Sequence, residues 1–122
     1  MKKLSPAMED YLKGIYRVGG AGKNVHVSEL ALYMGVSKPC VSRAMDNLSE
    51  KGLICKNKYQ GAYLTEEGVK QARLLSARCL VIRRFFSEIL HVDPHVAEKD
   101  ACSIEHSIST ESYESMRTYL HE

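Results

Sequence analysis

The fold is decided by residues 28–52, whose sequence is SELALYMGVSKPCVSRAMDNLSEKG. Apolar residues recur at helical spacing in both halves of this stretch, and the first helix runs from Ser28 to Gly35. Ser37 stands at an N-cap position, and Pro39 lies in the first turn of the second helix. Two short helices joined by a tight turn that contains glycine predict a helix-turn-helix. The side chains expected to face its core are Leu30, Ala31, Met34, Val41, Met45 and Leu48.

The segments on either side extend this unit into a winged form. Before it, Ser5-Pro6 begins a helix whose apolar positions continue to Gly19-Gly20. After it, residues 53–56 and 62–64 have the composition of short strands around a turn, which predicts a β-hairpin. Helix, helix-turn-helix and hairpin in this order predict a winged helix-turn-helix DNA-binding domain, which we place at residues 1–72.

Residues 73–122 are predicted to form a helical domain, so the whole chain is expected to be mainly α. Thr65-Glu66-Glu67-Gly68 caps a long helix over about 66–90, and two further helices are expected at about 94–108 and 110–121. The apolar residues of this domain exceed what so short a segment can bury alone, and part of them is expected to form a homodimer interface. They are Val81, Ile82, Phe85, Phe86, Ile89, Ile104, Ile108 and Leu120.

The composition is that of a folded protein without a membrane segment. No apolar run approaches the roughly 20 residues that span a bilayer. The N-terminus becomes polar at once and lacks the apolar stretch of a signal peptide. The four cysteines are widely scattered, unlike a disulfide framework, which fits a reducing compartment. The sequence therefore predicts a cytoplasmic protein with no membrane partner and no small-molecule substrate.

Charge divides unevenly along the chain. Residues 1–75 contain 12 Lys and Arg against 7 Asp and Glu, a net charge of +5. Residues 76–122 contain 5 against 8, a net charge of −3. A basic first part suits a polyanion such as DNA, and an acidic second part suits cations or a partner subunit.

The most reactive side chains of the second part are close together in the sequence. On a helix, Cys102, Glu105 and His106 are spaced i, i+3 and i+4, so a thiol, a carboxylate and an imidazole share one face. When deprotonated, these groups are ligands of divalent transition metals. Each residue alone is more often structural, but together they predict a metal site.

The second helix of the helix-turn-helix is expected to enter the major groove with its first turn foremost. Arg43 could make a bidentate contact with guanine, which is worth ~1–3 kcal/mol of discrimination. Pro39 either touches a thymine methyl group or only begins the helix. The hairpin residues are candidates for phosphate contacts. The DNA-binding residues predicted in this way are Ser37, Lys38, Pro39, Cys40, Ser42, Arg43, Lys56, Lys58 and Tyr59.

Four sequence features together resemble the diphtheria toxin repressor family, whose shorter branch is the manganese transport regulators. They are SPAMEDYL at residues 5–12, Gly35-Val36-Ser37, LTEEG at residues 64–68 and Glu105-His106. The resemblance covers essentially the whole chain, with DNA-binding and metal motifs in the family's order. It implies a homodimeric, metal-activated repressor of metal-uptake genes that binds a palindromic operator. Longer members add a C-terminal SH3-like domain, which is not expected here.

The resemblance also implies a ligand set. Cys102, Glu105 and His106 fall on the family's primary ligands, and Asp10 falls on a first-helix ligand. Cys79 stands where the family has a histidine. It is either a fifth ligand or a side chain that contacts the ligands without binding the metal. Asp, Glu and His suit manganese(II) or iron(II), whereas thiolates favour iron(II), zinc(II) or cobalt(II). We expect iron(II) ahead of manganese(II), with zinc(II) or cobalt(II) bound in vitro.

Two residues depart from the family pattern. Lys13 and Arg83 stand where relatives have glutamate ligands, and they share helical faces with Asp10 and Cys79, respectively. A protonated Lys or Arg cannot bind a metal and supplies positive charge in its place. The hypothesis that follows is one metal ion per subunit, with Lys13 and Arg83 replacing the second.

Three other functions are compatible with parts of the sequence. One is a thiol-redox-responsive regulator, in which Cys79 and Cys102 react with oxidants. Another is a winged-helix regulator that has lost metal control through Lys13 and Arg83. An enzyme is disfavoured, because the chain has no HExxH pair, nucleophile elbow or glycine-rich phosphate loop. The sequence therefore predicts a DNA-binding regulator that is not an enzyme.

Overall fold

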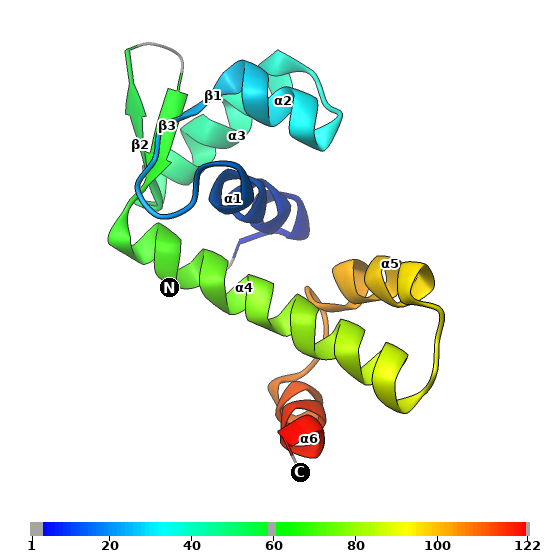
Figure 1. The fold of residues 1–122 in the computed structure, drawn as a ribbon. Coiled ribbons are helices and arrows are strands. Elements are labelled where there is room, and N and C mark those ends of the chain that lie inside the picture. Colours follow the sequence, from blue (N-terminus) through cyan, green and yellow to red (C-terminus); the bar gives the residue numbers. More distant parts are fainter. Residues whose placement is uncertain (1–3, 59–60, 122) are drawn as a thin grey trace. The chain divides into compact units, whose positions relative to one another are not determined.

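The computed structural model of this chain describes residues 4–58 and 61–121. They divide into two compact units, Met1–Arg73 and Leu74–Glu122, referred to below as the N-terminal and C-terminal units. The fold is mainly helical with one small sheet, as predicted (Figure 1). Among the described helices, none has the length and apolar character needed to cross a membrane.

Three helices with local capping signals build most of the N-terminal unit: α1 (Pro6–Gly19), α2 (Val27–Met34) and α3 (Lys38–Glu50). Ser5 and Ser37 are N-caps, as predicted, and their hydroxyl oxygens accept from the N–H groups of Met8 at 3.2 Å and Cys40 at 3.3 Å. Helix α2 begins one residue earlier than expected, because the His26 side chain caps it together with Glu29.

A three-stranded antiparallel sheet completes this unit. Its strands are β1 (Val25–His26), β2 (Ile54–Asn57) and β3 (Gly61–Leu64), in the order β1-β3-β2. The pair β2–β3 is the predicted hairpin, with Ile54 opposite Leu64. Strand β1 was not predicted, because two residues are too few to give an alternating pattern. The predicted contact residue Tyr59 lies outside the described residues.

The core of the N-terminal unit confirms the predicted inward face of the helix-turn-helix. Leu30, Ala31, Val41, Met45 and Leu48 are buried, and Met34 is half-buried. They pack with side chains of α1 and of the hairpin, among which Leu12, Ile15, Leu53, Ile54 and Leu64 are buried. Fully burying one such side chain contributes about 1.5–3 kcal/mol, so the orientation of α3 is set by apolar packing.

The junction between the hairpin and α4 (Glu66–Arg84) is fixed by backbone contacts. The Thr65 hydroxyl donates to the carbonyl oxygen of Gly52 at 2.8 Å and accepts from the N–H of Gly68 at 3.1 Å. A Cβ atom at Gly68 would overlap the carbonyl oxygen of Leu53. Only glycine therefore allows α4 to begin so close to the hairpin.

The C-terminal unit contains the end of α4, a π-helical turn η1 (Phe85–Ile89), α5 (Pro94–Ile104) and α6 (Thr110–His121). The single helix expected to run to about residue 90 changes at Phe85, whose carbonyl oxygen accepts from the N–H of Leu90 at 3.2 Å. Helix α6 lies where it was predicted. Helix α5 ends at Ile104, about four residues before its expected end.

The core of the C-terminal unit is small. Cys79, Ile82 and Ala101 are buried at its centre, and α4 and α5 contribute them. Half-buried apolar side chains surround them: Phe86, Cys102, Ile104, Ile108 and Met116. The two cysteines named as candidate metal ligands therefore belong to, or pack against, the apolar core.

Candidate functional site

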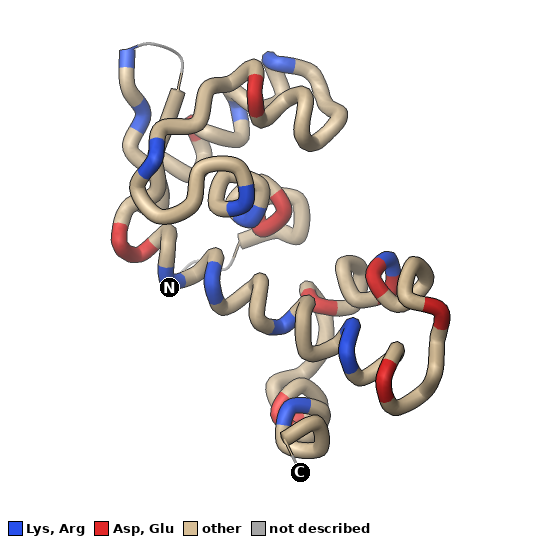
Figure 2. Tube along the Cα trace, in the orientation of Figure 1, with Lys and Arg blue, Asp and Glu red and all other residues tan. Residues whose placement is uncertain are grey.

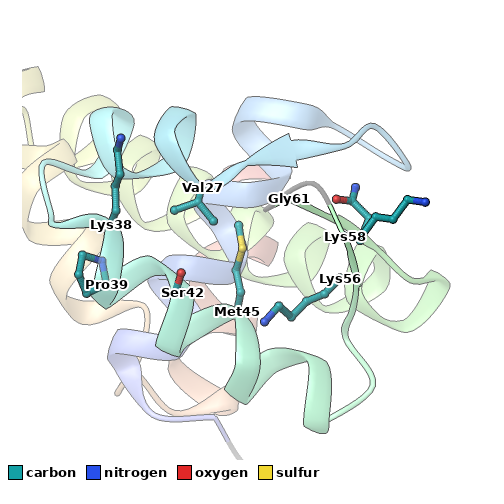
Figure 3. A pocket seen from close by; sticks show the side chains of 9 residues that line it. Val27, Lys38, Pro39, Ser42, Met45, Lys56, Lys58 and Gly61 are labelled. Carbon is teal, nitrogen blue, oxygen red and sulfur yellow. The ribbon is translucent and has the colours of Figure 1, made fainter.

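The first candidate surface surrounds the start of α3. A groove of about 400 Å³ is lined by Lys38, Pro39 and Ser42 from α3 and by Lys56 and Lys58 from the hairpin side (Figure 3). Figure 2 shows Lys and Arg segments along this hairpin. The structure thus brings together five of the predicted DNA-binding residues, and four of them offer exposed cationic or hydroxyl groups beside the start of a helix. Such groups bind phosphate oxygens.

Ser37, Cys40 and Arg43 form a polar group on the first turns of α3. The Arg43 Nη2 atom donates to the Cys40 Sγ atom at 3.7 Å. The hydrogen bond with Ser37 lowers the pKa of the Cys40 thiol; burial opposes this, and the positive charge of Arg43 lowers the pKa further. Burial raises the pKa of Tyr11 on α1, with opposite contributions from Cys40 and Arg43. In this structure Arg43 therefore contacts Cys40.

Lys56 is also paired within the N-terminal unit. Its ammonium group makes an ion pair with Asp46, an exposed residue of α3. Both side chains remain partly exposed to solvent. Any contact between Lys56 and phosphate must therefore compete with Asp46.

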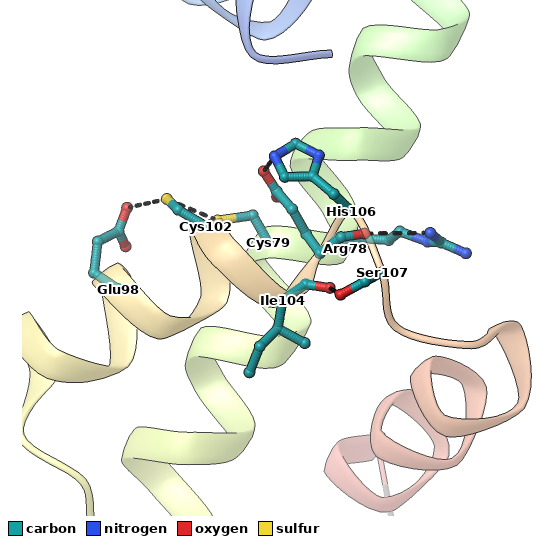
Figure 4. A network of polar contacts seen from close by, with 8 residues as sticks. Arg78, Cys79, Glu98, Cys102, Ile104, His106 and Ser107 are labelled. Atoms are coloured by element: carbon teal, nitrogen blue, oxygen red, sulfur yellow. Dashed lines mark hydrogen bonds and ion pairs between the residues drawn. The ribbon is translucent and has the colours of Figure 1, made fainter. Parts of the chain in front are cut away.

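The second candidate region is a cluster of two thiols and a carboxylate in the C-terminal unit (Figure 4). The Sγ atoms of Cys79 and Cys102 lie 3.8 Å apart, and the Cys102 thiol donates to the Glu98 Oε1 atom at 3.9 Å. The three ligand atoms lie within 4.8 Å of one another. Cys79 is only 3% exposed, whereas Cys102 and Glu98 are half-buried. We refer to these three residues as the thiol cluster.

Arg83 borders the thiol cluster. Its Nη1 atom forms an ion pair with the Glu98 Oε2 atom at 3.0 Å, and both side chains are partly exposed. The guanidinium group therefore places a positive charge beside the carboxylate of the thiol cluster. Lys13, the other predicted replacement, is buried in α1 and is 5% exposed.

Glu105 and His106 form a separate pair in the turn that follows α5. The Glu105 N–H still donates to the Ala101 carbonyl oxygen at 3.0 Å, so the helical path continues briefly past Ile104. The Glu105 side chain is wholly buried, and its Oε1 atom lies 3.6 Å from the His106 Nε2 atom. Arg78 donates to the Glu105 carbonyl oxygen at 3.4 Å, as the dashed line in Figure 4 shows.

Within the C-terminal unit, Cys102 lies with Cys79 and Glu98, and the Glu105 carboxylate lies beside the His106 imidazole. Asp10 is an exposed residue of α1 in the N-terminal unit. Glu98 was missed by the sequence analysis, although its position four residues before Cys102 places both on one helical face.

The chemistry of these groups fits a transition metal ion. Two thiols beside a carboxylate suit zinc(II), iron(II) or cobalt(II), and an imidazole beside a buried carboxylate suits any of these or manganese(II). A buried carboxylate such as Glu105 is costly unless a positive group compensates it. The types of donor atom and the burial of Glu105 and Cys79 are therefore what make these side chains suitable for a transition metal ion.

Two protein families account for nearly the whole chain. Residues 3–62 match the family described as the N-terminal DNA-binding domain of the iron-dependent repressor. Residues 65–122 match the one described as the metal-binding and dimerisation domain of the iron-dependent repressor.

The transcriptional regulator MntR of Escherichia coli O157:H7 is 30% identical over 115 residues, which cover 92% of this chain and 72% of that protein. An uncharacterised HTH-type transcriptional regulator of Methanocaldococcus jannaschii is 28% identical over 118 residues, covering 96% of this chain and 94% of that protein.

Solved structures are similar in fold as well. The metal-dependent transcriptional regulator MtsR superposes with a TM-score of 0.84 at 27% identity, covering 97% of this chain and 55% of that one. ScaR with bound Zn²⁺ has a TM-score of 0.78 at 31% identity, covering 93% of this chain and 53% of that one. The present chain spans about half the length of these structures. As the sequence resemblance predicted, the chain belongs to the iron-dependent repressor family of metal-dependent transcriptional regulators, the family of the diphtheria toxin repressor and MntR.

Proposed function

We propose that this chain is a metal-activated repressor of metal-uptake genes that binds a palindromic operator as a cytoplasmic homodimer. One observation carries the proposal: this member of the family has both of the features that such a repressor needs. It has an exposed cationic surface at the start of α3, and a cluster of metal-ligand side chains on α4 and α5. We assign DNA binding to residues 1–72, and metal binding and dimerisation to residues 73–122. The matched family regions support this division.

In this proposal, α3 recognises the operator in the major groove. Lys38, Ser42 and Lys58 bind phosphate oxygens and fix the position of the helix. Arg43 exchanges its contact with Cys40 for a bidentate contact with guanine. Arg43→Ala should therefore reduce discrimination between operator and altered operator by about tenfold, whereas Lys51→Ala, at the far end of α3, should not. Unchanged discrimination in Arg43→Ala would exclude direct reading by this residue.

We propose that the metal is held by Asp10, Cys102, Glu105 and His106. Cys79 is either a fifth ligand or a side chain that contacts the ligands without binding the metal. The donor chemistry of the C-terminal unit supports the last four, and the resemblance of residues 5–12 to the family supports Asp10. Burial of Glu105 and Cys79 keeps water away from these groups. A bound divalent ion would compensate the charge of the carboxylate and of any thiolate.

We propose iron(II) as the physiological metal, ahead of manganese(II), and one ion per subunit. The thiols favour iron(II), while the similarity to a regulator named MntR favours manganese(II). The ion pair between Arg83 and Glu98 supports a single ion, because this guanidinium already compensates the carboxylate nearest the thiols. Elemental analysis that gives two ions per subunit would exclude the single-ion proposal.

In this proposal, the affinity for the metal and the affinity for the operator depend on each other. If metal binding favours the arrangement of the dimer that fits the operator, metal and DNA must increase each other's affinity by the same factor. Exposed apolar side chains of the C-terminal unit support dimerisation through this unit. They are Leu74, Leu80, Leu90, Val96 and Tyr119.

The test is operator affinity of chelator-treated protein, measured by fluorescence anisotropy in reducing buffer during titration with iron(II), manganese(II) or zinc(II). We expect a metal-dependent increase of at least about fivefold, the lower range of known coupling. The increase should vanish in Cys102→Ala and persist in Cys55→Ala, a thiol on β2 outside the cluster. Equal affinity with and without metal would support the metal-independent alternative.

A further inference from the structure

The thiol cluster contains two cysteines in contact, outside any disulfide. Cys79 comes from α4 and Cys102 from α5, and their Sγ atoms lie 3.8 Å apart. A disulfide needs a separation of about 2.0 Å. The remaining distance is within the reach of a change in side-chain torsion angle at Cys102, whose side chain is only half-buried. The two sulfur atoms are thus already in contact within the small core that α4 and α5 share.

The two thiols differ in their access to solvent. Cys79 is 3% exposed and is part of the apolar core, whereas Cys102 lies at the edge of that core. A small oxidant dissolved in water can therefore reach Cys102 first. Cys79 is then the partner that attacks the oxidised sulfur from inside.

A proton acceptor lies beside the accessible thiol. The Cys102 S–H donates to the Glu98 Oε1 atom at 3.9 Å, and Arg83 holds the other carboxylate oxygen at 3.0 Å. Oxidation requires the thiolate, since the thiol itself is a poor nucleophile. Glu98 can take up the proton as the sulfur reacts, and the ion pair keeps its carboxylate turned toward Cys102.

From this geometry we propose that Cys79 and Cys102 form a dithiol site for hydroperoxides, which closes to an intramolecular disulfide. The Cys102 sulfur attacks one peroxide oxygen and the O–O bond breaks. A sulfenic acid forms, and the leaving oxygen takes a proton to give water or an alcohol. The Cys79 sulfur then attacks the Cys102 sulfur and displaces hydroxide, which takes the Cys79 proton to give water. The two thiols lose two electrons, and the peroxide gains them.

The regulatory consequence rests on the proposed function. If Cys102 binds the metal, the disulfide removes that ligand, and metal in turn blocks access to the sulfur. Peroxide should then lower operator affinity when the metal is below saturation, and saturating metal should protect the repressor from this loss. Disulfide formation itself does not depend on DNA or metal, so it can be tested separately.

The experiment uses the full chain with Cys40→Ser and Cys55→Ser, which leaves only Cys79 and Cys102. The metal-free protein is treated with hydrogen peroxide and then mapped by mass spectrometry after digestion without reduction. We expect two peptides joined through Cys79 and Cys102, with the loss of two hydrogen atoms. The intact protein should keep the mass of a single chain, without a covalent link to a second copy. Disulfide-linked dimers, or only sulfinic and sulfonic acids at Cys102, would overturn the proposal.

Two further variants identify the roles of the residues. Cys79→Ala, which keeps the core apolar, should leave a sulfenic acid at Cys102 that a cyclic diketone traps. Glu98→Gln should slow the reaction about a hundredfold, the lower range for a positioned general base. Thermal unfolding of each variant shows whether it is folded. An unchanged rate in folded Glu98→Gln would remove the carboxylate from the mechanism.

A last comparison separates this inference from the proposed metal site. In the same protein, saturating zinc(II) should slow disulfide formation if Cys102 is a ligand. A disulfide that forms at the same rate with zinc(II) present would support the dithiol site and count against ligation by Cys102. Slower oxidation with metal supports both proposals.

Discussion

The two units of this chain place their reactive side chains in opposite environments. In the N-terminal unit, Lys38, Ser42 and Arg43 are exposed on α3, and its buried face carries only apolar residues. In the C-terminal unit, Cys79 is itself a core residue, and Cys102 packs against the core. The difference teaches that substitutions on the DNA surface can change recognition alone. Substitutions in the thiol cluster change chemistry and stability together.

The largest expected effect tests whether the N-terminal unit depends on its internal framework rather than on its surface. Gly68→Ala places a Cβ atom against the Leu53 carbonyl oxygen, and neither backbone segment can move without breaking the Thr65 hydrogen bonds. We expect a loss of about 3 kcal/mol in the free energy of unfolding, measured with urea. The control is Glu67→Ala, an exposed neighbour in the same turn of α4. Equal stability of the two variants would show that the junction is adaptable.

The next prediction compares the two environments directly through the same substitution. Cys79→Ser places a hydroxyl group in a site that is 3% exposed, and should lower the free energy of unfolding by about 2 kcal/mol. Cys40→Ser, at the start of α3, should change it by less than about 0.5 kcal/mol. Chemical denaturation of both variants measures the difference. Similar losses would mean that the two thiols are not in different environments.

The same contrast explains what the sequence could predict. The N-terminal unit is specified by local signals: Ser5 and Ser37 as caps, Gly35 as a helix end and apolar residues at helical spacing. These signals act within a few residues, so the winged fold and the exposed face of α3 were predictable. Strand β1 was not, because its two residues form a strand only by pairing with β3.

The C-terminal site depends on contacts between helices, which the sequence pattern does not contain. Spacing within one helix grouped Cys102 with Glu105 and His106. In the structure the helix ends at Ile104, and packing of α4 on α5 brings Cys102 to Cys79. The π-helical turn at residues 85–89 was hidden for the same reason, because its sequence continues the helical pattern. The spacing of Glu98 and Cys102 was visible in the sequence. Several other glutamates lie nearby, however, and nothing in the sequence distinguished Glu98 from them as a partner of a thiol.

A smaller effect is expected at the cap of α3, because Ser37 affects both the stability of the helix and the reactivity of Cys40. The hydrogen bond with Ser37 lowers the pKa of the Cys40 thiol, so its thiolate persists at a lower pH than that of an ordinary cysteine. Ser37→Ala should raise this pKa, and the alkylation rate of Cys40 should then rise only at higher pH. Loss of the cap should also cost about 1 kcal/mol of unfolding free energy.

The pH profile of alkylation at Cys40 is measured by mass spectrometry in wild type and Ser37→Ala. Cys55 in the same molecules is the internal control, because it lies on β2 and not beside Ser37. An unchanged Cys40 profile with reduced stability would leave Ser37 with a capping role alone. The pKa of Cys40 would then not depend on its hydrogen bond with Ser37.

The smallest effect tests whether the DNA surface is partly neutralised by the protein itself. Asp46 pairs with Lys56 beside the groove at the start of α3, and both are partly exposed. An exposed ion pair is worth at most about 1 kcal/mol, so its loss should not affect folding. Asp46→Asn releases Lys56 and removes a negative charge near the phosphates. DNA of any sequence should then bind up to about fivefold more tightly.

The dependence of affinity on salt decides how Lys56 takes part. If Lys56 stays with Asp46 in the wild-type complex, the variant gains one phosphate contact, and the slope of log affinity against log salt steepens by about 0.9. If Lys56 already leaves Asp46 for a phosphate, affinity rises while the slope stays the same. Glu50→Gln, an exposed acid near the end of α3, is the control for net charge. An equal gain in both variants would mean that only overall charge matters, and that Lys56 is not a DNA contact.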